Sequence, residues 1–235
     1  MDRTAAQVFA DDFAQQSAEW IAERIAAIVD LRGRCAVALS GGHTPAAVYR
    51  ELSRCSVAWS RVTIFFGDER AVAADASDSN YAMARQALLD RLPTPQPVVH
   101  RIEADRDDLA AAARRYAALL PPALDLVLLG LGPDGHTASI FPNSAAFAPG
   151  VGRVLAVAAP PPPLLPQVAR ITVTPMALHA AAELAMLVTG AEKAAMVARV
   201  LDGPLDPVML PAQLARRGTW LLDDAAAAHL QPREH

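Results

Sequence analysis

Asp134 and His136 are the residues best suited by type and spacing to acid–base chemistry. Both lie in the turn 130–136, directly after the most apolar run of the chain. Histidine is the side chain that exchanges protons near neutral pH, and Asp134 or another carboxylate could hold its tautomer. His136 is therefore the favoured general base, and an ordinary surface histidine is the alternative. The remaining histidines lack this setting and are expected to be structural or exposed: His43, which borders the site, and His100, His179, His229 and His235.

A second polar segment, 67–70 (Gly-Asp-Glu-Arg), follows another apolar run. The forked guanidinium of Arg70 suits a phosphate, a carboxylate or a developing oxyanion. Asp68 could orient a water molecule or hold Arg70. Taken alone, the segment is more typical of a solvated charged turn.

The segment 40–45 (Ser-Gly-Gly-His-Thr-Pro) combines small residues with hydroxyl groups where a strand meets a helix. Small residues let the backbone approach a ligand, and free N–H groups at a helix start favour an anion. Ser40, Gly41, Gly42 and Thr44 are thus candidates for a phosphate cradle, and an ordinary strand–helix turn is the equal alternative. The segment matches neither the dinucleotide nor the P-loop pattern, so NAD and ATP gain no support.

Two cationic residues could complete such an anion site. Lys193 falls in an expected first helical turn, where the helix dipole disfavours a cation. A bound phosphate would explain that position, and pairing with Glu192 or another acid is the simpler alternative. Arg170 begins a β-rich segment and could supply another positive group.

Four of these polar segments, 40–45, 67–70, 130–136 and 190–193, share one position, because each follows an expected strand. The four strands are expected at 35–39, 62–66, 124–131 and 184–188. Helical patterns are expected at 10–31, 46–52, 80–92, 107–120, 176–182 and 192–201, and β segments at 170–174 and 219–222. The alternation predicts an α/β fold, a doubly wound and mostly parallel sheet with helices on both faces. In such a sheet the carboxyl ends of the strands lie along one rim, where ligands bind.

Composition limits the classes of partner. The chain has 235 residues, 53% of them hydrophobic and 20% charged, with a net charge of −4. We expect one domain, 1–235, that makes no contact with nucleic acid, since no basic block occurs. The start, Met1–Thr4, has no apolar signal core, and no apolar run reaches the ~20 residues of a membrane span, so we expect a cytoplasmic protein. Cys35 and Cys55 lack metal-site spacing, and we expect neither a metal nor a cofactor.

Taken in order, the motifs resemble the 6-phosphogluconolactonase family over nearly the whole chain. The resemblance is carried by the segments 40–45, 67–70, 79–80, 130–142, 170–174 and 190–193. It implies a modified Rossmann-like fold shared with glucosamine-6-phosphate deaminase and ribose-5-phosphate isomerase. It also implies hydrolysis of 6-phospho-D-glucono-1,5-lactone, the second step of the oxidative pentose phosphate pathway. The implied partner is a small sugar phosphate, and the implied assembly is a monomer or weak homodimer.

The mechanism expected from this resemblance assigns a role to each candidate. His136 activates water, Arg70 or nearby backbone N–H groups stabilise the oxyanion, and Asp68 positions the water or Arg70. Lys193, Arg170 and the turn 40–44 hold the phosphate.

Two alternatives stay open. Deaminases are similar around Asp-Gly-His but continue Ile-Ala-Phe-Asn-Glu, whereas residues 137–142 read Thr-Ala-Ser-Ile-Phe-Pro, without the glutamate. A deaminase or isomerase activity is one alternative. The other is a non-catalytic sugar-phosphate sensor, which binds its ligand without turning it over.

Overall fold

The computed structural model describes residues 5–231. The expectations for Met1–Thr4 and for His235 therefore lie outside the described residues.

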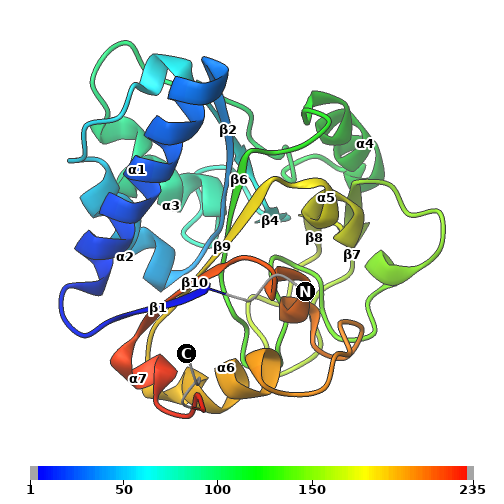
Figure 1. Ribbon diagram of the computed structural model, residues 1–235. Coiled ribbons are helices and arrows are strands. Elements are labelled where there is room, and N and C mark those ends of the chain that lie inside the picture. The colour runs from blue at the N-terminus through cyan, green and yellow to red at the C-terminus, as the bar shows by residue number, and fades with distance from the viewer. Residues whose placement is uncertain (1–4, 232–235) are drawn as a thin grey trace.

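Within this range a seven-stranded sheet forms the centre of the molecule, and all of its neighbouring strands pair in parallel (Figure 1). Its spatial order is β1 (Ala5–Phe9), β10 (Thr219–Asp223), β9 (Glu183–Val188), β6 (Leu126–Leu129), β2 (Cys35–Leu39), β3 (Val62–Phe66) and β5 (Val98–Val99). From β2 the chain proceeds outward through β3 to β5, and from β6 it proceeds in the other direction through β9 to β10. The order of strands therefore reverses between β2 and β6, where parallel sheets open a crevice for ligands.

Helices cover both faces of this sheet, which confirms the predicted doubly wound α/β fold. In Figure 1, α1 (Phe13–Arg32), α2 (His43–Leu52) and α3 (Asn80–Ala87) lie on one side, and α4 (Leu109–Leu119) and α5 (Pro175–Ala180) lie on the other. Helices α6 (Ala194–Leu201) and α7 (Asp224–Ala227) follow β9 and β10 at the lower end of the view. Short 3-10 turns occur at Trp59–Arg61, Leu89–Arg91, Ala145–Phe147, Ala191–Lys193 and Pro211–Ala215.

The hydrophobic core explains why these strands read as continuous apolar runs. Every residue of β6 is fully buried, as expected for a parallel strand covered on both faces. Two buried tyrosines then hold the ends of the neighbouring strands. The Tyr49 hydroxyl accepts a hydrogen bond from Ser40 N (2.9 Å), and the Tyr116 hydroxyl accepts one from Phe66 N (2.7 Å). The backbone that leaves β2 and β3 is thereby held in place just before the polar segments.

A second, smaller sheet lies beyond the carboxyl end of β3. It pairs β4 (Asp68–Arg70), β8 (Arg170–Val173) and β7 (Val154–Val157) in antiparallel fashion. The interpretation of 67–70 as a solvated charged turn is therefore wrong, because β4 is hydrogen-bonded to β8 and buries two carboxylates. The segment 170–174 is confirmed as β structure, but it belongs to this second sheet.

Several helix boundaries also differ from the expected ones, and the largest differences are at α3 and α2. The helix expected at 80–92 ends at Ala87 and is followed by the 3-10 turn Leu89–Arg91. The helix expected from residue 46 already begins at His43, directly after Gly42.

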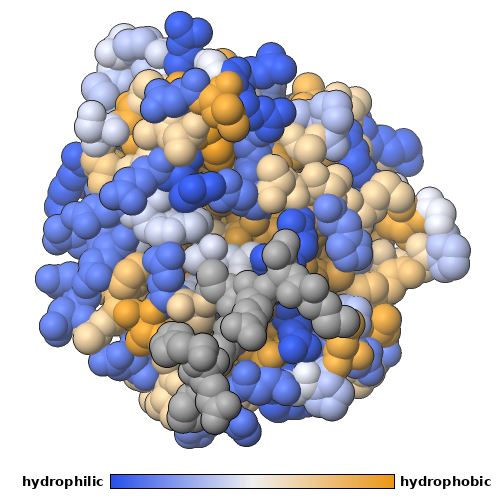
Figure 2. Space-filling view, in the orientation of Figure 1, coloured by the Kyte–Doolittle hydropathy of each residue, from blue (hydrophilic) through white to orange (hydrophobic). Residues whose placement is uncertain are grey.

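The surface is mixed in character. Figure 2 shows hydrophilic groups over much of the visible face near α1 and α2, with apolar groups scattered among them. Among the helices of residues 5–231, none combines the length and the hydropathy needed to cross a bilayer.

Candidate functional site

A cavity of about 230 Å³ opens at the carboxyl ends of β2 and β6, where the strand order reverses. Eight of the ten predicted site residues lie in its wall: Ser40, Gly41, Gly42, Asp68, Arg70, His136, Arg170 and Lys193. The remaining wall residues are Gly130, Leu131, Gly132, Pro133, Ala138, Leu164 and Leu165. The other two predicted residues, Thr44 and Asp134, stand behind this wall, where they contact neighbouring side chains.

Asp134 orients the imidazole of His136. One Asp134 oxygen lies 2.5 Å from His136 Nδ1 and also accepts the His136 backbone N–H at 3.1 Å. Burial by itself would raise the pKa of the Asp134 carboxyl, but the hydrogen bond and charge of His136 outweigh burial and hold that pKa below its usual range. An ionised Asp134 assigns the ring proton to Nδ1. Nε2 has no partner among residues 5–231, so it is the ring nitrogen available to a molecule in the cavity.

The imidazole is also packed closely on both sides. A Cβ placed on Gly132 would lie 2.1 Å from His136 Nδ1, so only glycine leaves room for the ring at this point. The Phe141 ring lies against the imidazole with 4.8 Å between the ring centroids. The ring orientation is therefore set by packing as well as by Asp134.

Arg70 and Arg170 face each other across the small sheet. The β4–β8 register places them directly opposite, so that both side chains leave the same face. Arg170 is only 4% exposed, and burial lowers the pKa of its guanidinium, an effect that the Asp68 charge opposes and the Arg70 charge reinforces. Among residues 5–231, neither arginine forms an ion pair with a carboxylate, and the Nε atoms of both are buried without a partner. Buried like charges are costly, and an anion in the cavity would offset that cost.

The hydrogen bonds that these arginines do form are to neutral oxygens. Arg70 Nη1 donates to the carbonyl of Asp78 at 2.7 Å. Arg170 Nη2 donates to the carbonyls of Leu165 and Pro166, each at 3.3 Å, and Nη1 lies 3.5 Å from Ser139 Oγ. Within the described residues, neither guanidinium thus has a bonded carboxylate that an anionic ligand would have to displace.

Asp68 is buried and held by neutral donors. Its two carboxylate oxygens accept hydrogen bonds from Asn80 Nδ2 (3.0 Å) and from Ser139 Oγ (2.5 Å). Within the described residues, no hydrogen bond or ion pair joins Asp68 to Arg70. Of the two roles considered for Asp68, this geometry favours an action on a molecule in the cavity.

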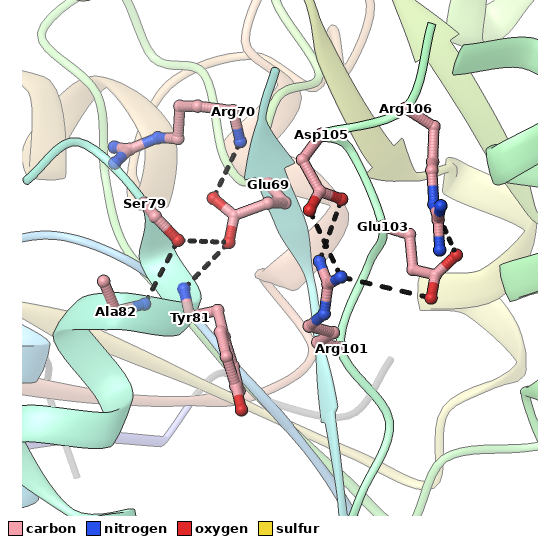
Figure 3. A network of polar contacts seen from close by, with 9 residues as sticks. All are labelled: Glu69, Arg70, Ser79, Tyr81, Ala82, Arg101, Glu103, Asp105 and Arg106. Atoms are coloured by element: carbon pink, nitrogen blue, oxygen red, sulfur yellow. Dashed lines mark hydrogen bonds and ion pairs between the residues drawn. The ribbon is translucent and has the colours of Figure 1, made fainter. Parts of the chain in front are cut away.

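Glu69 ties β4 to the start of α3, as Figure 3 shows. Its carboxylate accepts hydrogen bonds from the backbone N–H groups of Arg70, Asn80 and Tyr81, each at 2.8 Å, and from Ser79 Oγ at 3.1 Å. Burial raises the pKa of this carboxyl, and the three backbone donors counteract the rise. In Figure 3 the Arg70 side chain extends away from this carboxylate while its backbone N–H donates to it. Glu69 therefore positions Arg70 without neutralising it.

The turn after β2 approaches α3 closely. A Cβ on Gly41 would lie 1.7 Å from Asn80 Oδ1, which requires glycine at this position. The Ser40 hydroxyl is buried without a partner beside the cavity. The Thr44 hydroxyl lies 2.6 Å from that of Thr189, and this contact joins the turns that follow β2 and β9.

Lys193 reaches the cavity from the turn after β9. Its Nζ donates to the carbonyl of Leu131 at 3.0 Å. Among residues 5–231 it has no carboxylate partner, so the alternative, a pairing with Glu192 or another acid, does not form.

Several wall and support residues were missed from the sequence. Glu69, Asn80, Ser139 and Phe141 were not selected, and neither was the apolar pair in the proline-rich loop, Leu164 and Leu165. The Ser79-Asn80 pair at a helix start was a usable signal for Glu69. The free N–H groups at a helix N-terminus need hydrogen-bond acceptors, and the Glu69 carboxylate is one. Among the described residues, no group of three or more His, Cys, Asp or Glu side chains is arranged to hold a metal ion.

Comparison with known proteins agrees with the resemblance inferred from the motifs. The family model described as glucosamine-6-phosphate isomerases/6-phosphogluconolactonase matches residues 9–222. The 6-phosphogluconolactonase of Mycobacterium tuberculosis is 40% identical over 226 residues, covering 88% of this chain and 89% of the relative. The human 6-phosphogluconolactonase is 36% identical, covering 89% of this chain and 86% of the relative.

Solved structures agree as well. The 6-phosphogluconolactonase from Trypanosoma brucei superposes with a TM-score of 0.84 at 31% identity, covering 98% of this chain and 100% of that one. A monomeric glucosamine-6-phosphate deaminase superposes with a TM-score of 0.80, but its 21% identity indicates the shared fold alone. With its motifs, its fold and these relatives in agreement, the chain belongs to the family of glucosamine-6-phosphate isomerases and 6-phosphogluconolactonases.

Proposed function

We propose that this protein hydrolyses 6-phospho-D-glucono-1,5-lactone to 6-phospho-D-gluconate. The observation that carries the proposal is the convergence of His136, Arg70, Arg170 and Lys193 on one cavity, with His136 Nδ1 held by Asp134. An imidazole with a free Nε2 suits the activation of water, and the cations suit an anionic substrate. The relatives named 6-phosphogluconolactonase support the choice of lactone.

The proposed reaction is a proton-assisted attack of water on the lactone carbonyl. His136 Nε2 takes a proton from water as the water oxygen bonds to C1, and the carbonyl oxygen becomes an oxyanion. Arg70 stabilises this oxyanion, with Asp68 positioning the attacking water. When the intermediate collapses, the bond from C1 to the ring oxygen breaks. Protonated His136 then gives its proton to that oxygen, and the new carboxylic acid loses its proton to solvent.

The phosphate end of the substrate is held by the remaining wall. Lys193, Arg170 and the Ser40 hydroxyl bind the phosphate together with the backbone N–H groups of Gly41 and Gly42. Thr44 acts behind them by holding the turn after β9 against the start of α2. Binding the remote phosphate fixes the lactone against His136, which lowers the entropic cost of the reaction.

The proposed cellular compartment and metabolic pathway are those that the family resemblance implies. We place the reaction in the cytoplasm as the second step of the oxidative pentose phosphate pathway. Its partner is the small sugar phosphate itself, and every proposed step uses side chains of this chain.

The test is hydrolysis of freshly generated lactone, measured against the spontaneous rate without protein. His136→Ala should lower kcat about 10²–10⁴-fold. Circular dichroism checks that the variant folds, and His179→Ala, which changes a histidine on α5, serves as the matched control. Near-normal turnover by His136→Ala would remove this residue from the mechanism.

Two further measurements test the alternatives. Release of ammonia from glucosamine 6-phosphate would indicate a deaminase. Binding of phosphogluconate without hydrolysis above the spontaneous rate would indicate a sensor.

A further inference from the structure

Phe141 occupies a position between the two kinds of group that the proposed reaction needs, yet the reaction as written does not use it. Its side chain is 7% exposed and comes from the loop after β6. One contact of the ring is to the imidazole of His136, at 4.8 Å between centroids. Another is to the guanidinium carbon of Arg170, which lies 5.5 Å from the Phe141 centroid. One aromatic ring therefore contacts both the base and a buried cation.

The contact with His136 completes a set of three constraints. Asp134 holds Nδ1, and Gly132 lies so close that a Cβ there would meet Nδ1, Cε1 and Cγ. Asp134 alone would leave the ring free to tilt about that hydrogen bond. Phe141 restricts this tilt, so that Nε2 keeps one direction.

The contact with Arg170 serves the other end of the substrate. The described residues supply no carboxylate to this guanidinium, and its Nε has no partner. An aromatic face attracts a cation and keeps water away from it. Phe141 thus helps to keep Arg170 directed at the cavity while the ligand is absent.

We propose that Phe141 is a positioning residue, which fixes the direction of His136 Nε2 and of the Arg170 guanidinium together. This inference rests on the proposed lactonase function for its kinetic consequences. Its structural content, the ring orientation of His136 and the anion affinity of Arg170, can be measured without turnover.

The decisive variant is Phe141→Leu, which keeps an apolar side chain but removes the aromatic face. Phe141→Tyr retains the ring and is the conservative rescue. Phe147→Leu makes the same chemical change in the same loop region, at a phenylalanine for which no ring contact to His136 or Arg170 is found. Thermal melting of all three variants separates loss of folding from loss of positioning.

The kinetic readout is the division between kcat and KM. Phe141→Leu should lower kcat by about 10- to 100-fold, because small misplacements of a base have effects of this size. Phe141→Tyr should restore most of kcat, and Phe147→Leu should match the parent protein. Affinity for inorganic phosphate, measured by calorimetry, should fall about two- to fivefold in Phe141→Leu, the size of one cation–π contact.

The readout that does not depend on activity is the orientation of the His136 ring in crystal structures of the parent protein and the three variants. The parent protein should show one ring orientation, with Asp134 at Nδ1. Phe141→Leu should show more than one ring orientation, and Phe141→Tyr and Phe147→Leu should not.

These readouts separate the two proposals. A Phe141→Leu protein that folds, keeps the single ring orientation of His136 and keeps its kcat would overturn the positioning role while leaving the lactonase function standing. A parent protein without lactonase activity whose His136 ring still takes more than one orientation in Phe141→Leu would overturn the function and support the positioning role.

Discussion

Two arginine clusters in this protein differ in how their charges are satisfied. On the outer surface, Arg101 pairs with Asp105 at 3.0 and 3.2 Å, and Arg106 pairs with Glu103 at 3.1 Å, as Figure 3 shows. In the cavity, Arg70 and Arg170 face each other across β4 and β8 without a carboxylate partner in the described residues.

The difference separates structural charges from functional ones. Each surface arginine gives up contacts with water for a contact with a carboxylate that is itself exposed to solvent. Such ion pairs contribute little to the stability of the fold. The cavity pair is partly desolvated and has no direct carboxylate partner in the described residues, an arrangement that costs folding free energy until an anion binds. The cluster with the poorer hydrogen bonding is therefore the better candidate for function.

The sharpest way to test this contrast is to remove a cation from each cluster. Arg70→Ala should lower kcat for the lactone by about 10²–10³-fold, the effect of removing one oxyanion donor. Arg101→Ala should leave kcat unchanged. Steady-state kinetics with a correction for spontaneous hydrolysis measures both. If the two substitutions lowered kcat equally, the distinction between the functional and the structural cluster would be wrong.

Lys193 should show a different kinetic signature from Arg70. Lys193→Ala should raise KM by about 10- to 100-fold with a smaller change in kcat, because it removes a charged hydrogen bond to the remote phosphate. An unphosphorylated gluconolactone is the control substrate, and its kcat/KM should be unaffected. An unchanged KM for the phosphorylated lactone would reject the phosphate assignment.

Inorganic phosphate should stabilise the folded protein through the cavity cluster. At a phosphate concentration ten times Kd, the free energy of unfolding should rise by about 1.4 kcal/mol. Arg170→Met should reduce this gain, whereas Arg101→Ala should retain it. Denaturant melts with and without phosphate measure the difference, and full retention of the gain in Arg170→Met would contradict the role of Arg170.

The surface cluster should give the smallest effect and a distinct pH dependence. The hydrogen bond from Arg101 lowers the pKa of Asp105, so the pair stabilises the fold above the unfolded pKa and loses this contribution as the pH falls through the folded pKa. Arg101→Ala should therefore destabilise the protein by less than about 1 kcal/mol at neutral pH, and the difference should vanish in acid. Urea melts across this range check both points.

The sequence predicts five of the seven strands of the parallel sheet because their signals are local, and it misses the two edge strands β1 and β5. The runs at 35–39 and 62–66 coincide with β2 and β3, and the polar turns after β2, β6 and β9 lie where parallel topology requires. A strand buried on both faces leaves an uninterrupted apolar run, which can be recognised without knowing its neighbours.

The small sheet was not predictable in the same way. The segment 68–70 is three residues long and carries three charges, and nothing within it favours a strand over a turn. Its conformation is decided by pairing with β8, far along the chain, and by the bonds from α3 to Glu69. For the same reason, Arg70 and Arg170 were identified from the sequence as two separate candidates, and nothing in the sequence indicated that they are cross-strand neighbours.

The β4–β8 ladder has a consequence for how this protein tolerates insertions and deletions. Side chains alternate between the faces of a strand, so a one-residue change of length in either strand would turn Arg70 or Arg170 out of the cavity. The proline-rich loop before β8 lies outside this ladder and can change length without altering its spacing. Leu164, Leu165 and Pro166 contact the cavity or Arg170, so among related chains length variation should concentrate at 158–163 and avoid both strands.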